Sequence, residues 1–230
     1  MPNHVKNVIT LEGDLKSVKC TLELIAEDKE HPGLIDFNKI RMMPKSLDVP
    51  SGSDTQLAIE AVLKDLEHDD CYWTPKKLGA MDEADFKLRT EHCGKSHQEL
   101  LELGLQYITN KVRYGHTTWY GWCCDNWGTK WNAYDRSCDG NQIRFNTAWS
   151  APHPIIEEMA RLNDCITITH EWADEDIGSN CGRRVYERGD LSEEWFPDDG
   201  KEAIEFACGL WGWDSDEYIA DLEVEGNEVS

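Results

Sequence analysis

Polar and apolar residues alternate at the start of the chain and then change to a helical spacing. Every second residue from Val5 to Leu11 forms one mainly apolar face, which includes Asn7, and this is typical of a β-strand. Gly13-Asp14 ends this strand, and a helix follows whose apolar positions are Leu15, Val18, Leu22 and Ile25. Pro32-Gly33 ends the helix, and residues 37–43 are predicted to form a short extended segment that stops at Pro44.

Residues 46–93 have the pattern of a mainly helical insertion. Residues 48–53 read Asp-Val-Pro-Ser-Gly-Ser, which is typical of a linker, and Asp54 is predicted to cap the N-terminus of the helix that follows. The apolar positions of that helix are Leu57, Ala61, Val62 and Leu66. A second loop is expected around Thr74-Pro75.

A capping box starts the next helix, which leads into an aromatic segment. Ser96, with Glu99 three residues later, predicts a helix that continues to about Gly115. Residues 119–135 then contain four tryptophans, two tyrosines and two cysteines. Because each such ring removes roughly 150–250 Å² from water when buried, this density favours a core segment. A ligand pocket is the alternative, and its residues would be Trp122, Asp125, Trp127, Lys130 and Trp131.

The middle of the aromatic segment predicts a tight turn with a cation beside it. Gly128 is expected to allow the turn between a helix and a strand. Lys130 is expected to lie over an indole face, or to be held by Asp125.

The second half of the chain returns to strand patterns around one helix. Asp139-Gly140 predicts a hairpin turn before a strand over 142–149, and Pro152 and Pro154 predict the start of a helix. Strands are then expected over 165–172 and 181–188, the latter being the last. Strands that alternate with two covering helices indicate an α+β sandwich of the split βαβ type. We assign residues 1–190 to this domain and 191–230 to an acidic, aromatic C-terminal segment.

The charge of the chain sets the class of partner. The 45 acidic and 23 basic residues give a formal net charge of -22, which excludes ordinary nucleic-acid binding and favours a basic partner. Acidic residues are concentrated after Tyr186, where Arg188 and Lys201 are the basic residues. The alternative explanation is a solvated face followed by an acidic tail.

Three features of the sequence predict where in the cell the protein is located. Residues 1–7 do not lead into the apolar stretch of a signal peptide, and no stretch reaches the roughly 18 apolar residues of a membrane span. The nine cysteines are an odd number, which favours reduced thiols over a disulfide framework. We therefore expect a soluble cytoplasmic protein with no membrane partner.

Three segments resemble the YubB-like, ferredoxin-like family of proteins carried by bacteriophages and plasmids. They are residues 1–5 (Met-Pro-Asn-His-Val), 126–131 (Asn-Trp-Gly-Thr-Lys-Trp) and 173–182 (Ala-Asp-Glu-Asp-Ile-Gly-Ser-Asn-Cys-Gly), in the same order as in the family. Residues 46–93 and those after about Asp190 are the least alike. The resemblance implies a ferredoxin-like topology without an iron–sulfur cluster, in an accessory protein of a bacterial cytoplasm. It implies no chemistry for particular residues, and fold alone does not supply function.

The sequence contains two possible cation sites and two possible catalytic arrangements. Asp174, Glu175 and Asp176 have the oxygen donors that Ca²⁺ or Mg²⁺ prefers, although an EF-hand would need a glutamate where Val185 stands. A partial zinc site would combine His92, Cys93 and His97 with Cys71 or His68, but no Cys-x-x-Cys pair occurs.

A thiol nucleophile would be Cys123, with His116 or His170 as its base. An apolar setting beside tryptophans raises the pKa of a thiol, so packing is the better explanation. Asp198, Asp199 and Lys201 resemble a nuclease fragment but indicate a turn before a helix. No phosphate-binding glycine loop is present, and we predict no catalytic residue, cofactor or metal.

The leading hypothesis is a binding protein that inhibits a host defence or nucleic-acid-handling protein, such as a nuclease, by acidic mimicry of nucleic acid. An anti-restriction or anti-CRISPR factor would act in this way. The predicted acidic contacts are Glu193, Glu194, Asp198, Asp199, Asp214, Asp216 and Glu217, and the predicted aromatic anchors are Trp195, Phe196, Trp211 and Trp213. The alternatives are an enzyme or ligand-binding protein with a pocket in the Trp-rich segment, and a structural domain that self-associates through its sheet edge.

Overall fold

The computed structural model describes residues 3–67 and 81–220. The chain divides into two compact units. Met1–Met42 and Cys123–Ser230 form the first, here called the sheet unit, and Met43–Trp122 forms the second, the helical unit. Helix α6, Trp119–Trp127, contains the boundary between them.

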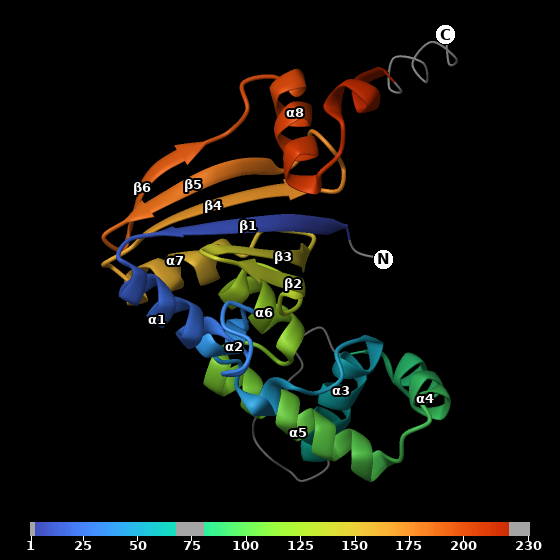
Figure 1. Ribbon diagram of the computed structural model, residues 1–230. Coiled ribbons are helices and arrows are strands. Elements are labelled where there is room, and N and C mark those ends of the chain that lie inside the picture. The colour runs from blue at the N-terminus through green and yellow to red at the C-terminus, as the bar shows by residue number, and fades with distance from the viewer. Residues whose placement is uncertain (1–2, 68–80, 221–230) are drawn as a thin grey trace. The chain divides into compact units, whose positions relative to one another are not determined.

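The sheet unit is built on six antiparallel strands (Figure 1). The strands are β1 His4–Glu12, β2 Tyr134–Asp139, β3 Gln142–Ala148, β4 Thr167–Asp174, β5 Cys181–Glu187 and β6 Asp190–Trp195. Their order in the sheet is β2-β3-β1-β4-β5-β6, so the first strand of the chain lies in the middle. The predicted strands over 4–11, 142–149, 165–172 and 181–188 are confirmed to within a few residues.

Helices lie on both faces of the sheet (Figure 1). They are α1 Leu15–Ile25, α2 Phe37–Ile40, α7 His153–Leu162 and α8 Gly200–Trp211. α7 packs on the face that carries His170 and Trp172, because the His153 ring contacts both of those rings. α8 packs on the opposite face, where Ala203 and Ala207 form a buried cluster with Ala173.

The alternation of side chains along a strand explains how one sheet packs against helices on both of its faces. Side chains of successive residues point to opposite faces, so Trp172 and Ala173 face α7 and α8 respectively. Ile9, Phe145 and Ile168 are fully buried. Fully burying one aliphatic or Phe side chain contributes roughly 1.5–3 kcal/mol, so this apolar layer is the main source of the sheet unit's stability.

The helical unit has a core of its own. It consists of the short 3₁₀ helix η1 Lys45–Leu47 and the helices α3 Ser53–Glu67, α4 Glu83–His92 and α5 His97–Tyr114. Its core lies between α3 and α5, where Leu57, Ala61, Leu100 and Tyr107 are buried. The predicted capping box of Ser96 and Glu99 is confirmed, as is the end of α5 at Gly115. The loop expected at Thr74-Pro75 lies outside the described residues.

Two local predictions in the first half of the chain are wrong. Residues 37–40 form a helical turn rather than an extended segment, because the Asp36 carboxylate accepts a hydrogen bond from the Asn38 N–H and caps the turn. Asp54 is not the N-cap of its helix: α3 begins at Ser53, and the Asp54 carboxylate forms an ion pair with Lys95 at 2.5 Å.

The prediction that the strand over 181–188 is the last one is also wrong. β6 follows it and pairs antiparallel with β5. Five of the six β6 side chains are exposed. The segment therefore lacks the alternation of burial by which the other strands were predicted.

Candidate functional site

The acidic residues of β6 are matched by arginines of β5. The Arg184 Nε atom lies 2.6 Å from Glu194 Oε1, and Arg183 Nη2 lies 3.4 Å from Glu193 Oε1. Glu193 and Glu194 are neighbours on a strand, so they project from opposite faces of the sheet. Both predicted contact residues are therefore present at the surface, but each is partly neutralised and they do not share one face.

Arg184 lies in a cluster that links three elements. Its guanidinium is 3.5 Å from Glu157 of α7, in addition to Glu194 of β6, and it lies 5.8 Å from the centre of the Trp172 ring. Its side chain is 19% exposed, so these contacts are screened less than ordinary surface pairs. The cluster attaches the edge strand to the layer beneath it.

The acids at the start of α8 form a helix cap. The Asp199 carboxylate accepts a hydrogen bond from the Glu202 N–H at 2.9 Å, and the Glu202 carboxylate accepts one from the Asp198 N–H at 2.6 Å. The predicted turn before a helix at Asp198, Asp199 and Lys201 is confirmed. Asp199 is occupied with helix capping and is less available to a partner than the sequence indicated.

Of the predicted aromatic anchors, two secure the C-terminal segment and two are about half exposed. Trp195 packs edge-on against Phe206, and the Trp211 Nε1–H donates to the Asp174 carbonyl at 3.0 Å. In contrast, Phe196 is 51% exposed and Trp213 is 48% exposed. The first pair contributes to folding and the second pair offers apolar surface to solvent.

Three rings at the end of the described chain lie against one another. The centroids of Trp211 and Trp213 are 5.8 Å apart, and those of Trp213 and Tyr218 are 6.3 Å apart. We call these three residues the tryptophan stack. Lys6 of β1 reaches the Trp211 ring from the sheet, with its Nζ 4.9 Å from the centroid.

Acidic residues surround the tryptophan stack. The Asp214 carboxylate accepts hydrogen bonds from the N–H groups of Asp216 and Glu217, so it caps the short helical turn that carries Tyr218. Asp216 and Glu217 are both exposed. The structure thus brings together Trp211, Trp213, Asp214, Asp216 and Glu217 of the predicted contacts, whereas Glu193 and Glu194 lie on the β6 edge.

The Trp-rich segment is split between core and surface. Trp122 and Trp127 are buried, as the core prediction required, and the Trp127 Nε1–H donates to the Arg41 carbonyl at 2.9 Å. Trp131 is 39% exposed, so the core prediction is wrong there. Gly128 has a φ of +78°, and a Cβ there would lie 2.6 Å from Pro154 Cδ, which confirms the tight turn.

Lys130 lies over an indole face, as predicted. Its Nζ is 4.6 Å from the centre of the Trp131 ring and 4.5 Å from that of Trp149. Asp125, the alternative partner in the sequence analysis, is exposed. Trp149 is not predictable as a partner of Lys130, because the alternation places it in a strand that in fact ends at Ala148.

The thiol and histidines considered for catalysis lie in apolar surroundings. Burial raises the pKa of Cys123 to about 12, so the thiolate is disfavoured. His170 is fully buried, its Nε2 is 3.0 Å from Asn7 Oδ1, and burial lowers its pKa well below the ordinary value. Packing therefore explains both residues. His116 belongs to the helical unit.

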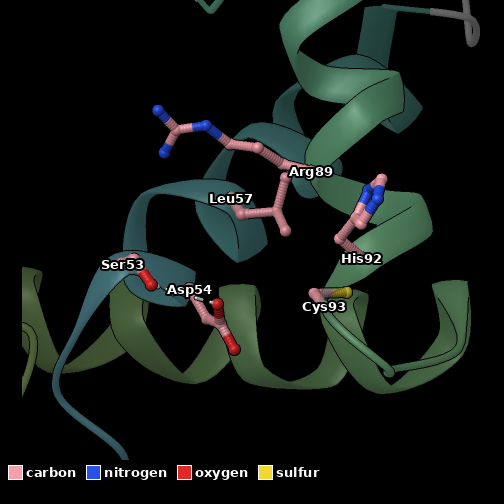
Figure 2. A pocket seen from close by; sticks show the side chains of 6 residues that line it. All are labelled: Ser53, Asp54, Leu57, Arg89, His92 and Cys93. Carbon is pink, nitrogen blue, oxygen red and sulfur yellow. Dashed lines mark hydrogen bonds between the residues drawn. The ribbon is translucent and has the colours of Figure 1, made fainter.

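A small cavity in the helical unit gathers other polar groups (Figure 2). It has a volume of about 270 Å³ and is lined by Ser53, Asp54, Leu57, Arg89, His92 and Cys93. The His92 Nδ1–H donates to the Leu88 carbonyl at 2.7 Å, which fixes the ring on its own helix. His97, the third zinc ligand considered, instead lies 3.6 Å from Asp65.

No group of three or more potential metal ligands occurs within residues 3–67 and 81–220. Cys71 and His68, which would have completed the zinc site, lie outside that range. In the loop considered for a divalent cation, Asp174 Oδ1 accepts hydrogen bonds from the Asp176 N–H and the Asn3 side chain. No described helix is both long and apolar enough to cross a membrane.

One family model matches a part of the sheet unit. Residues 126–223 match the family model described as "Ferredoxin-like domain in Api92-like protein". This region contains five of the six strands, all except β1. A search of curated proteins finds no match.

One solved structure is similar over most of the chain. It is the crystal structure of the protein Api92 from Yersinia pseudotuberculosis, at 12% identity, and the match covers 86% of this chain and 99% of that one. The TM-score is 0.43. The domain nevertheless has the mixed α+β, ferredoxin-like fold, and residues 126–223 are similar to the ferredoxin-like domain of Api92-like proteins.

Proposed function

We propose that this chain is a non-catalytic binding protein that holds a basic partner protein at the tryptophan stack. The observation that carries the proposal is an exposed aromatic surface within an acidic segment. Trp213 is 48% exposed between two other rings, and Asp216 and Glu217 follow it on the next turn. Aromatic side chains are typical anchors of interfaces, and acidic neighbours favour a partner that carries Lys or Arg.

The chemistry of the stack suits a cationic side chain. Indole faces attract ammonium and guanidinium groups, and Trp211 already has Lys6 over its ring at 4.9 Å. The net charge of -22 would speed the approach of a basic partner and weaken its binding at high salt. We assign the contact to Trp213, Asp216 and Glu217.

The finer identity of the partner follows from the same charge. A basic channel that normally receives DNA or RNA presents the Lys and Arg side chains that such a surface would bind, so a bacterial nuclease or other nucleic-acid-binding protein is the proposed target. The resemblance to phage and plasmid accessory proteins supports inhibition of a host defence protein in the bacterial cytoplasm. Glu193 and Glu194 contribute less, since arginines of β5 already neutralise them.

The test is capture from a bacterial lysate by the tagged full chain. The binding variant is Trp213→Ala with Asp216→Lys and Glu217→Lys, and the control is Glu83→Lys with Glu91→Lys, two exposed acids on α4. Both variants change the net charge by the same amount. We expect a basic protein that is captured at low salt, released at high salt, and lost from the binding variant alone.

Measured affinities then decide the proposal. We expect the binding variant to lose at least about ten-fold in affinity for the purified partner, which corresponds to ~1.4 kcal/mol. Equal loss in both variants would mean that only the overall charge matters, and no loss in either would contradict the assigned contact. Competition by DNA for the same partner would support mimicry, and indifference to DNA would contradict it.

A further inference from the structure

Two surface tryptophans enclose a cation of the same chain. The Lys130 Nζ atom lies 4.6 Å from the centre of the Trp131 ring and 4.5 Å from that of Trp149. The two tryptophans are 39% and 44% exposed, while Lys130 itself is only partly exposed. An ammonium group between two accessible indole faces is the arrangement by which aromatic sites bind cations.

The backbone at this place is held in an uncommon conformation. Trp149 has a φ of +72°, a region that bulky residues rarely adopt, and its N–H donates to the Asn3 carbonyl at 2.9 Å. The Thr129 hydroxyl donates to the Ala148 carbonyl at 2.8 Å, and the Ser150 hydroxyl donates to the Gly128 carbonyl at 2.6 Å. These bonds connect the segments that carry the two indoles, so the site is built before any ligand arrives. Strained conformations of this kind are concentrated at functional sites.

We propose that Trp131 and Trp149 form a binding site for a lysine side chain of a partner protein, and that Lys130 occupies this site until the partner displaces it. The resident ammonium demonstrates that the two rings accept the group, and an external lysine carries the same group. Because Lys130 is attached beside the site, it competes at a high effective concentration. Lys130 is therefore displaced only by a partner that makes further contacts nearby, or whose cation binds the two rings more tightly. This inference does not rest on the tryptophan stack.

The test follows the indole N–H signals of Trp131 and Trp149 in the ¹⁵N-labelled full chain by NMR, assigned with Trp131→Phe and Trp149→Phe. The probe is tetramethylammonium chloride, with sodium chloride at equal ionic strength as the salt control. We expect both signals to move saturably in the wild type, and to do so at about ten-fold lower concentration in Lys130→Ala, because removing the resident raises the fraction of open sites.

Two variants complete the design. Lys201→Ala removes a lysine whose side chain is 73% exposed on α8, and we expect it to behave as the wild type does. Lys130→Ala combined with Trp149→Leu should abolish the response. Signals that do not move in the wild type at any probe concentration, or that move equally in sodium chloride, would overturn the proposal even if Lys130→Ala failed to fold.

The chemical class of the cation is tested in the same way. n-Butylammonium reproduces the end of a lysine side chain, and guanidinium reproduces that of arginine. In Lys130→Ala, where the site is open, we expect n-butylammonium to move both signals at lower concentration than guanidinium does. The reverse order would overturn the assignment to lysine. If Lys130→Ala and the wild type bind tetramethylammonium equally well, Lys130 does not occupy the site.

Discussion

At the scale of single residues, two neighbouring histidines of the sheet unit stand out, of which His170 is buried and His153 is partly buried. His153 and His170 have ring centroids 5.6 Å apart, and neither Nδ1 atom has a hydrogen-bond partner among the described residues. Burial, followed by the nearby charge of Arg184, lowers the pKa of His153 from 6.5 to about 4. Burial also lowers the pKa of His170. Both imidazoles are therefore neutral in the folded protein at neutral pH.

This arrangement predicts a loss of stability in mild acid. Below pH 6.5 the unfolded chain binds protons at these histidines while the folded chain does not, so the free energy of unfolding falls as the pH decreases from 6.5 to about 4. We expect His153 to account for on the order of 2 kcal/mol of that loss. Urea unfolding at a series of pH values measures it.

The matched variants are His153→Gln and His92→Gln. His92 is exposed on α4, and its replacement is the control for the loss of a histidine as such. His153→Gln should make the dependence shallower, and His170 should contribute to the part that remains. If His153→Gln follows the wild-type pH curve, the proton is not excluded from this ring in the folded state.

At the scale of the elements, the close approach of α3 and α5 depends on one glycine. A Cβ at Gly104 would lie 2.1 Å from the Ala58 carbonyl oxygen, which is backbone and cannot turn aside. Alanine is normally the better helix former, by roughly 0.8–1.0 kcal/mol. Here the overlap forces the helices apart and reverses the sign of the substitution.

We therefore expect opposite effects of the same change in two helices. Gly104→Ala should destabilise the helical unit by about 1–3 kcal/mol, because the packed core must shift. Gly209→Ala in α8, where no atom lies within 4 Å of the added Cβ, should stabilise the chain by about 0.4–1 kcal/mol. Thermal unfolding of the two variants beside the wild type measures both, and stabilisation by Gly104→Ala would mean that α3 and α5 are not packed at this distance.

The elements also differ in how far the sequence predicts them. β1, β3 and β4 are long and alternate clearly, and α5 carries both a capping box and a C-terminal glycine, so pattern alone located them. α2 spans four residues, which is too short to show a helical period. β6 is an acidic edge strand without a buried face, and two of its acids form ion pairs with Arg183 and Arg184 of the preceding strand.

The candidate sites were predictable only where their residues are neighbours in the sequence. Lys130 and Trp131 are neighbours in the sequence, so their contact could be foreseen. Trp149 comes from another segment and meets Lys130 only because the chain turns through Gly128 and leaves β3 at a positive φ. Likewise, the sequence predicted the turn at Asp199, but nothing in it distinguishes Asp214, which caps a helical turn, from Asp216 and Glu217, which are exposed.

At the scale of the whole molecule, the net charge of -22 acts against the compact state. Several ion pairs among the described residues, such as Lys19 with Glu23 and Lys201 with Glu205, lie on exposed side chains and contribute at most about 1 kcal/mol each. Repulsion among the remaining acids is long-ranged and is screened by salt, with a Debye length of roughly 10 Å at 0.1 M and 3 Å at 1 M.

Added salt should therefore stabilise this protein. We expect the urea midpoint to rise between 0.02 M and about 0.5 M sodium chloride, where repulsion is largely screened. Potassium chloride at the same ionic strength serves as the control for a specific effect of sodium. A midpoint that falls with salt would mean that the ion pairs, such as Arg184 with Glu194, outweigh the repulsion.

The central place of β1 has a consequence for synthesis on the ribosome. Asn7 of β1 and its partner His170 of β4 are 163 residues apart in the chain. At roughly 5–20 residues per second, the first strand waits on the order of 10–30 s before its second neighbour is made. α3 and α5 are close in sequence and can associate during that interval. Until β3 and β4 are made, the nascent chain thus presents an unpaired apolar strand to which a chaperone could bind.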